Sequence, residues 1–275
     1  MATKLQRISE LMKQTINQVT DNPRSWPNFL RTASRLYKYP FEEQILIYTQ
    51  RPDATACASI EFWNKQMRRW VNRGVKGIAL IDDSKGKMTL RHVFDVLDTH
   101  SLEHTPIHLW QMENMYQEQV IEELSHQFGD PDETSLGFEG QLRDIIRNTV
   151  QDNMADYLAE LLNGRDGSYL ADLDELNAGT MFKEALTDSV SFMVFSRLGL
   201  DIKALPDDLF KDIFNFNTFD TVMQLGGAAS DISEMVLRQI ERTVKSIEKQ
   251  ERDRLAKPAR LEDNIIRDTE TAAAC

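Results

Sequence analysis

The stretch VKGIALIDDSKGKMTLRHVFDV, residues 75–96, decides the fold class. Gly77 to Ile81 is a short apolar run, residues 82–87 are typical of a turn, and residues 88–96 alternate with β-branched and aromatic side chains. Two such runs joined by a polar turn are typical of an antiparallel β-hairpin. The sequence therefore predicts strands in a chain whose other segments have helical patterns.

The segments before this hairpin have the apolar spacing of helices. The first helix is expected to carry its apolar stripe on Leu5, Ile8, Leu11, Met12, Ile16 and Val19. A second helix is expected to begin with Ser25 as N-cap and to bury Trp26, Phe29, Leu30, Ala33 and Leu36. Residues 41–50 predict a third helix, and Ser59 is expected to cap a short fourth one. Residues 1–100 are thus predicted to be a small α+β domain.

The segments after the hairpin predict helices only. The candidate helices cover residues 109–127, 136–162, 180–198, 205–214 and 230–255. Residues 101–255 are expected to form an acidic helical domain, and residues 256–275 a disordered tail or linker. The predicted fold class is α+β, with the helix-and-hairpin domain first and a mostly α-helical domain after it.

The charge of the chain changes sign between these two parts. Residues 1–100 hold 16 Lys and Arg against 10 Asp and Glu, and residues 101–240 hold 8 against 26, within a total net charge of −12. The first part can neutralise phosphates, whereas the second would repel them. Any contact with nucleic acid is therefore expected in the first hundred residues.

The chain has no pattern of a membrane protein or of a secreted one. No window of about 18 apolar residues occurs, and no apolar core follows the first lysine, so a cytoplasmic location is expected. Two cysteines, Cys57 and Cys275, exclude a disulfide framework and a four-cysteine zinc site.

The candidates for catalysis are incomplete, so no enzyme and no cofactor are predicted. Glu123 and His126 have the spacing of a metal-binding pair on a helix, but the further ligands that such sites need are missing. His92, His100, His104 and His108 gather before and within a polar connector, where a metal site is the less favoured of two interpretations. A polar cleft and helix caps are two interpretations of Asn153, Asn215, Asn217 and Ser230, and caps are favoured.

A second constellation combines cations with aromatic rings near the hairpin. Cations bind phosphates and exposed rings stack on bases, which is the composition of a surface for single-stranded nucleic acid. The same residues can also be core aromatics and a solvated face, and composition alone favours neither interpretation. The basic residues between Trp63 and the end of the hairpin are Lys65, Arg68, Arg69, Arg73, Lys76, Lys85, Lys87 and Arg91.

The sequence of residues 20–100 resembles the ArdC-like N-terminal domain. That domain is a single-stranded-DNA-binding module of antirestriction proteins and of large proteins on conjugative elements. The resemblance is carried by Trp26, Phe29, Leu30, Ala33, Tyr39, Phe41, Gln44, Leu46, Ile47, Gln50, Pro52, Ala54, Thr55, Trp63, Arg69, Val71, Gly74, Lys76, Gly77, Ile78 and Val93 to Val96. Antirestriction members continue into a zinc metallopeptidase domain, which this chain does not contain, so that activity is not carried over.

Residues 140–245 are similar to the helical segment that follows this domain in very large conjugative-transposon proteins. The similarity lies mainly in residues 152–158, 189–191, 214–218 and 225–232. DNA-methylase and helicase domains occur later in those proteins and are absent from this sequence. The chain is therefore either a short stand-alone relative or a fragment.

The leading hypothesis is a non-enzymatic protein, or fragment of one, from a conjugative mobile element that binds single-stranded DNA; whether it also protects transferred DNA (antirestriction) is left open. The residues predicted to contact DNA are Arg68, Arg69, Trp70, Arg73, Lys76, Lys87 and Arg91. The alternative is an anti-defence protein whose acidic helical domain inhibits a restriction or CRISPR enzyme. A metal-dependent enzyme is a third and weaker hypothesis.

Overall fold

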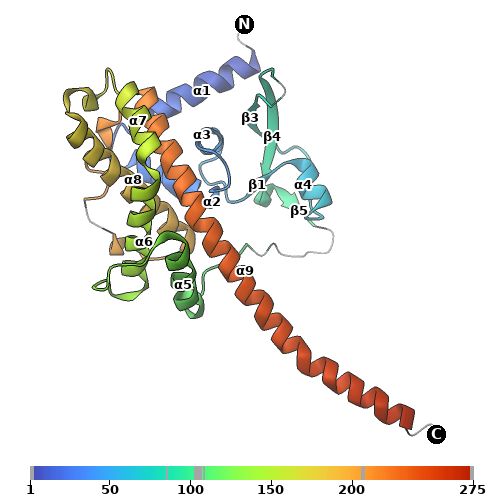
Figure 1. The fold of residues 1–275 in the computed structure, drawn as a ribbon. Coiled ribbons are helices and arrows are strands. Elements are labelled where there is room, and N and C mark those ends of the chain that lie inside the picture. The colour runs from blue at the N-terminus through green and yellow to red at the C-terminus, as the bar shows by residue number, and fades with distance from the viewer. Residues whose placement is uncertain (1–2, 85, 102–106, 108, 206–207, 273–275) are drawn as a thin grey trace.

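The computed structural model describes residues 3–84, 86–101, 107, 109–205 and 208–272, and Figure 1 shows their arrangement. The helices are α1 (Lys4–Gln18), α2 (Ser25–Arg35), α3 (Phe41–Gln50), α4 (Ile60–Lys65), α5 (Gln117–Phe128), α6 (Gly137–Asn153), α7 (Ala155–Gly164), α8 (Glu175–Leu198) and α9 (Phe219–Ala272). The strands are β1 (Cys57–Ala58), β2 (Trp70–Val71), β3 (Ile78–Asp82), β4 (Thr89–Asp95) and β5 (Thr99–His100). This combination of helices and antiparallel strands confirms the predicted α+β fold class.

The predicted hairpin is present as β3 and β4. These strands pair antiparallel, with Ile78 opposite Val93 and Leu80 opposite Arg91. β1 joins the other edge of β4, while β2 and β5 form a separate antiparallel pair. Because opposite residues in an antiparallel pair share a face, Ile78, Leu80 and Val93 lie on one side of the hairpin. They pack into a small core with Leu46 and Ile47, two buried residues of α3, and other apolar side chains.

The outer edge of β3 is held by a side chain. Gln50, the last residue of α3, donates from Nε2 to the carbonyl of Ala79 and accepts from the amide N–H of Ala79 with Oε1, each at 2.9 Å. One amide side chain thus satisfies both backbone groups that a neighbouring strand would satisfy. This contact fixes α3 against the sheet.

A larger core joins the first hundred residues to the later helices. Trp26 of α2 is fully buried and donates from Nε1 to the hydroxyl of Ser189 in α8 at 2.9 Å. Thr20 donates to the carbonyl of Phe216 at 2.5 Å. The same apolar cluster runs from Ile16 to Val244. The predicted boundary at residue 100 therefore separates the strands from the later helices, but it does not separate two cores.

The long helix α9 differs from its prediction at both ends. It begins at Phe219 rather than at residue 230, and it continues to Ala272 where a disordered tail or linker was predicted from residue 256. Residues 256–272 hold three Ala, two Arg, two Glu and one Leu, which favour helices, together with Pro258, which does not. Figure 1 shows α9 crossing the molecule diagonally, with its C-terminal half extending away from the other elements.

Other helix predictions were partly wrong. Residues 136–162 form two helices, α6 and α7, rather than one. In the segment 205–214, the described residues 208–212 form turns, and Phe210 has a φ of +66°, which an α-helix does not allow. The helix predicted for 109–127 begins only at Gln117. Ser25 is the first residue of α2 and not its N-cap, whereas Ser59 caps α4 as predicted by accepting from the N–H of Phe62.

No helix in the described ranges has both the length and the apolar composition that crossing a membrane requires. The length of α9 does not make it an exception, because charged and polar residues recur along it.

The crossing of α3 and α9 depends on a glycine. A Cβ atom on Gly226 would lie 2.2 Å from Cε2 of the buried Phe41 ring, which is closer than real side chains approach each other. One turn further along α9, the hydroxyl of Ser230 accepts from Nε2 of Gln44 at 3.0 Å and donates to the carbonyl of Tyr39 at 3.3 Å. The absence of a side chain at residue 226 lets α3 approach closely enough for these contacts.

We expect Gly226→Ala to destabilise the protein by about 3 kcal/mol, because its methyl group overpacks the α3–α9 crossing. Gly227→Ala is the matched control: nothing lies within 4 Å of its Cβ position, so the substitution should stabilise α9 by about 0.5–1 kcal/mol. Urea unfolding followed by circular dichroism measures both changes. Equal stability of the two variants would contradict the close approach.

Candidate nucleic-acid interface

The short helix α4 is anchored to the sheet by its buried tryptophan. Trp63 donates from Nε1 to the carbonyl of Phe94 at 2.9 Å and accepts from the N–H of Arg69 at 2.9 Å with its own carbonyl. The chain reverses between these residues at Arg68, whose φ is +49°. This turn leads directly from α4 into β2, so the side chains of both elements lie close together.

The segment from α4 to β3 presents cations and exposed rings together. Between Lys65 and Lys76 there are five basic residues and no acidic one. Phe62 is 46% exposed and Trp70 is 39% exposed, which is unusual for rings of this size. We call the following residues the basic–aromatic surface: Phe62, Lys65, Met67, Arg68, Trp70, Arg73 and Lys76. Figure 1 shows α4 and β5 on the side of the molecule opposite α7 and α8.

The cations of the basic–aromatic surface are exposed and without carboxylate partners. Within the described part of the chain, none of Lys65, Arg68, Arg73 and Lys76 forms an ion pair. Gly74 between them has a φ of +88° and open space around its Cβ position. The loop therefore offers positive charge to solvent with little steric obstruction.

Arg69 has a structural role. Its Nε donates to the hydroxyl of Thr99 at 2.7 Å, and one of its terminal nitrogens donates to the carbonyl of Thr99 at 2.9 Å. These bonds connect the start of β2 to β5. The phosphate contact predicted for Arg69 would need N–H donors that these bonds to Thr99 already use.

Arg91 is neutralised and Lys87 lies apart. A terminal nitrogen of Arg91 lies 2.5 Å from both carboxylate oxygens of Glu43 in α3. Lys87 is exposed in the turn of the hairpin, whereas Lys76 precedes its first strand, so the length of β3 separates them by more than about 13 Å. Of the seven residues predicted to contact DNA, Arg68, Trp70, Arg73 and Lys76 are exposed and lie within nine consecutive positions of the chain.

A buried carboxylate that sequence reasoning did not single out organises the base of this region. Asp95 is fully buried, and its oxygens accept from the N–H groups of Thr55 at 2.6 Å, Ala56 at 3.2 Å and Leu97 at 2.9 Å. Backbone donors of this kind stabilise a carboxylate without a metal or a cation. Asp95 therefore holds the segment before β1 against the end of β4.

The histidines do not gather into a metal site in the described residues. His92 lies 3.0 Å from the ammonium nitrogen of Lys4, and burial together with that charge lowers the pKa of His92. The ring of His100 contacts Asn72 Oδ1 at 2.7 Å. His104 and His108 lie outside the described residues. Across the described ranges, no three His, Cys, Asp or Glu side chains are placed to hold one metal ion.

The four polar residues considered for a cleft are each engaged in hydrogen bonds within the fold. Asn153 donates to the carbonyl of Thr149, and Asn215 donates to that of Asp212. Asn217 accepts from the N–H of Tyr169, and Ser230 bonds to Gln44 and Tyr39 at the helix crossing. Their hydrogen bonds stabilise helix ends and crossings rather than a cleft.

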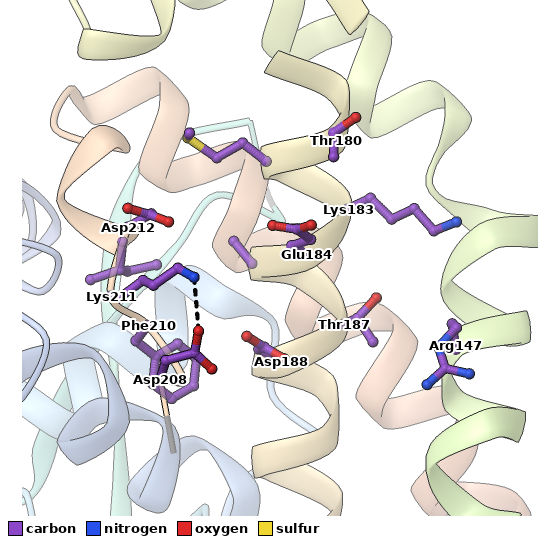
Figure 2. A pocket seen from close by; sticks show the side chains of 13 residues that line it. Arg147, Thr180, Lys183, Glu184, Thr187, Asp188, Asp208, Phe210, Lys211 and Asp212 are labelled. Carbon is purple, nitrogen blue, oxygen red and sulfur yellow. Dashed lines mark hydrogen bonds and ion pairs between the residues drawn. The ribbon is translucent and has the colours of Figure 1, made fainter. Parts of the chain in front are cut away.

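A hollow of about 540 Å³ on the helical part is lined by α8 and the turns of residues 208–213 (Figure 2). Asp208 forms an ion pair with Lys211 at 2.8 Å. Asp188 is half-buried beside them, and burial, together with the charges of Asp208 and Glu184, raises its pKa to about 6 against the opposing effect of Arg143 and Lys211. Its lining holds four carboxylates and three cations, which leaves a net charge of −1.

Comparisons with protein-family models, with curated proteins and with solved structures find no match for this chain.

We expect Asp188→Asn to stabilise the protein by about 1 kcal/mol at pH 7.5. A folded-state pKa near 6, raised from 3.8, means that the carboxyl group favours the folded state below about pH 4 and that this advantage is lost as pH rises through 6. Because the substitution removes the charge, it should raise the free energy of unfolding at pH 7.5 and change that free energy little at pH 4. Thermal unfolding at both pH values measures the difference; an equal effect at both would contradict the raised pKa.

Proposed function

We propose that the chain binds single-stranded DNA through the basic–aromatic surface, as a non-enzymatic protein of a conjugative mobile element that works in the cytoplasm. The observation that carries this proposal is the combination of Arg68, Arg73 and Lys76, exposed and unpaired within the described chain, with the exposed rings of Phe62 and Trp70. Cations attract the phosphates, and rings stack on bases at about 1–3 kcal/mol per base.

The exposed rings favour an unpaired strand over a duplex. Bases in a duplex are already stacked on one another, so a ring on the protein surface gains contact only where bases are free. Phe62 and Trp70 come from neighbouring elements, α4 and β2, and the cations lie between and beyond them in the chain. This arrangement suits binding that depends on the backbone and the faces of bases and reads little sequence.

The charge distribution restricts where on the molecule the strand binds. Residues 101–240 hold 26 acidic and 8 basic residues, and they repel a polyanion from the helical part. The strand is thereby confined to the side of the molecule that carries α4 and β2. The resemblance to the ArdC-like N-terminal domain supports the same kind of ligand.

We expect the triple variant Arg68→Ala, Arg73→Ala and Lys76→Ala to bind labelled oligothymidine about tenfold more weakly or worse at low salt. Loss of three phosphate contacts also reduces the slope of log affinity against log salt by about 2. Fluorescence anisotropy at several salt concentrations measures both quantities.

The matched control removes three exposed cations from the helical part, with Lys203→Ala, Arg242→Ala and Lys249→Ala. It makes the same change in net charge and should retain most of the affinity. The proposal fails if both triple variants lose affinity equally, or if the unaltered protein binds no single strand.

Trp70→Ala tests the stacking contribution separately. It should weaken binding by about 1–3 kcal/mol for every base composition while leaving the salt slope unchanged, because the substitution removes a ring and no charge. Quenching of tryptophan fluorescence by the oligonucleotide provides a second measurement, which should decrease in this variant. A changed salt slope without loss of quenching would place the strand elsewhere.

A further inference from the structure

The structure contains a second positively charged site, a cleft of about 520 Å³ between the sheet and the helical part. We call it the cationic cleft, and its charged lining consists of Arg35, Lys38, Arg197, Lys245 and Glu241. Four cations against one carboxylate leave a net charge of +3. The side chains come from α2 and the turn after it, from α8 and from α9, so only the folded chain assembles them.

The carboxylate of Glu241 gathers the two lysines. Lys245 donates to Oε1 at 2.6 Å, and Lys38 lies 2.8 Å from Oε1 and 2.6 Å from Oε2. The hydroxyl of Tyr37 donates to Oε2 at 2.6 Å. Burial alone would raise the pKa of Glu241, but the hydrogen bonds from Lys245, Lys38 and Tyr37 outweigh burial and lower it to about 2. Both ammonium groups therefore stay close together at the rim of the cleft, where their side chains are 45% and 59% exposed.

The two guanidinium groups are held in place without a carboxylate. Arg197 stacks over Trp110 with 3.9 Å from its central carbon to the ring centroid, and it donates to the carbonyl of the same residue at 3.0 Å. Arg35 donates from Nε to the carbonyl of Ala54 at 2.7 Å. Arg35 also donates from Nη2 to the carbonyl of Pro52 at 3.2 Å, and the charges of Asp53 and Asp95 act on it without a direct ion pair. Arg197 forms no ion pair within the described residues, so it is the guanidinium group that is fixed in advance with the least anionic compensation, which lowers the entropy cost of binding an anion.

We propose that the cationic cleft binds a phosphate monoester of about nucleotide size. Guanidinium groups match the geometry of phosphate oxygens, and paired ammonium groups add point charges. The volume lies in the range of small-molecule sites, and Tyr39 and Leu109 add apolar surface on which a base can lie. The shared chemistry has two sources, a free nucleotide and the 5′-phosphate of a DNA strand. This proposal does not depend on DNA binding at the basic–aromatic surface.

Isothermal titration calorimetry of the full chain with AMP, with a 5′-phosphorylated oligothymidine and with its 5′-hydroxyl counterpart tests the proposal. We expect saturable binding of AMP, of the phosphorylated end, or of both, and the responsive probe identifies the source. The double variant Lys38→Gln and Lys245→Gln should weaken that binding at least tenfold. The control Lys203→Gln and Lys249→Gln should leave it unchanged.

Glu241→Gln keeps the test decisive if the double variant folds poorly. It removes the negative charge from the cleft, so affinity for the phosphate should rise about fivefold, a gain that misfolding does not produce. The proposal is overturned if no phosphorylated probe saturates, or if neither variant changes the affinity. The triple variant of the basic–aromatic surface should bind AMP normally, which separates failure of this site from failure of the DNA interface.

Discussion

The Phe41 ring against the backbone of Gly226 is the contact on which the arrangement of both parts depends. It brings α3 onto α9, and α3 at the same time packs Leu46 and Ile47 under the hairpin. One helix thus contacts the sheet with part of its surface and the helical part with another. Gln44 adds a buried polar link to Ser230 at the same crossing. The position of the sheet, and with it the position of α4 and β2, follows from this crossing.

The sequence was sufficient wherever local pattern decides structure. Alternation predicted the β3–β4 hairpin, and three- and four-residue spacing predicted the buried face of α2 with Trp26 and Phe29. It was insufficient where partners lie far apart in the chain. Arg91 and Glu43 lie 48 residues apart in the sequence, so no local pattern predicts their ion pair. The turns at 208–212 were likewise mistaken for a helix, because their apolar residues have helical spacing although Phe210 has a positive φ.

The candidate sites show the same division. The cations and exposed rings from Phe62 to Lys76 are near one another in the sequence, so composition alone could single them out. The cationic cleft joins residues from Arg35 to Lys245, and only the folded chain reveals it. Several residues that carry the ArdC-like resemblance serve the scaffold: Trp63 anchors α4, Gln50 holds β3 and Arg69 bonds to Thr99. In this structure these residues hold the sheet and its flanking elements together.

The amide of Gln50 on Ala79 has a consequence for solubility. An uncovered outer strand is a template on which a second molecule can extend the sheet, and proteins that leave one open tend to aggregate. Here both backbone groups of Ala79 are already bonded to Gln50, so an incoming strand would have to displace a side chain fixed at the end of α3. A single glutamine thereby protects the outer edge of the hairpin from edge-to-edge association.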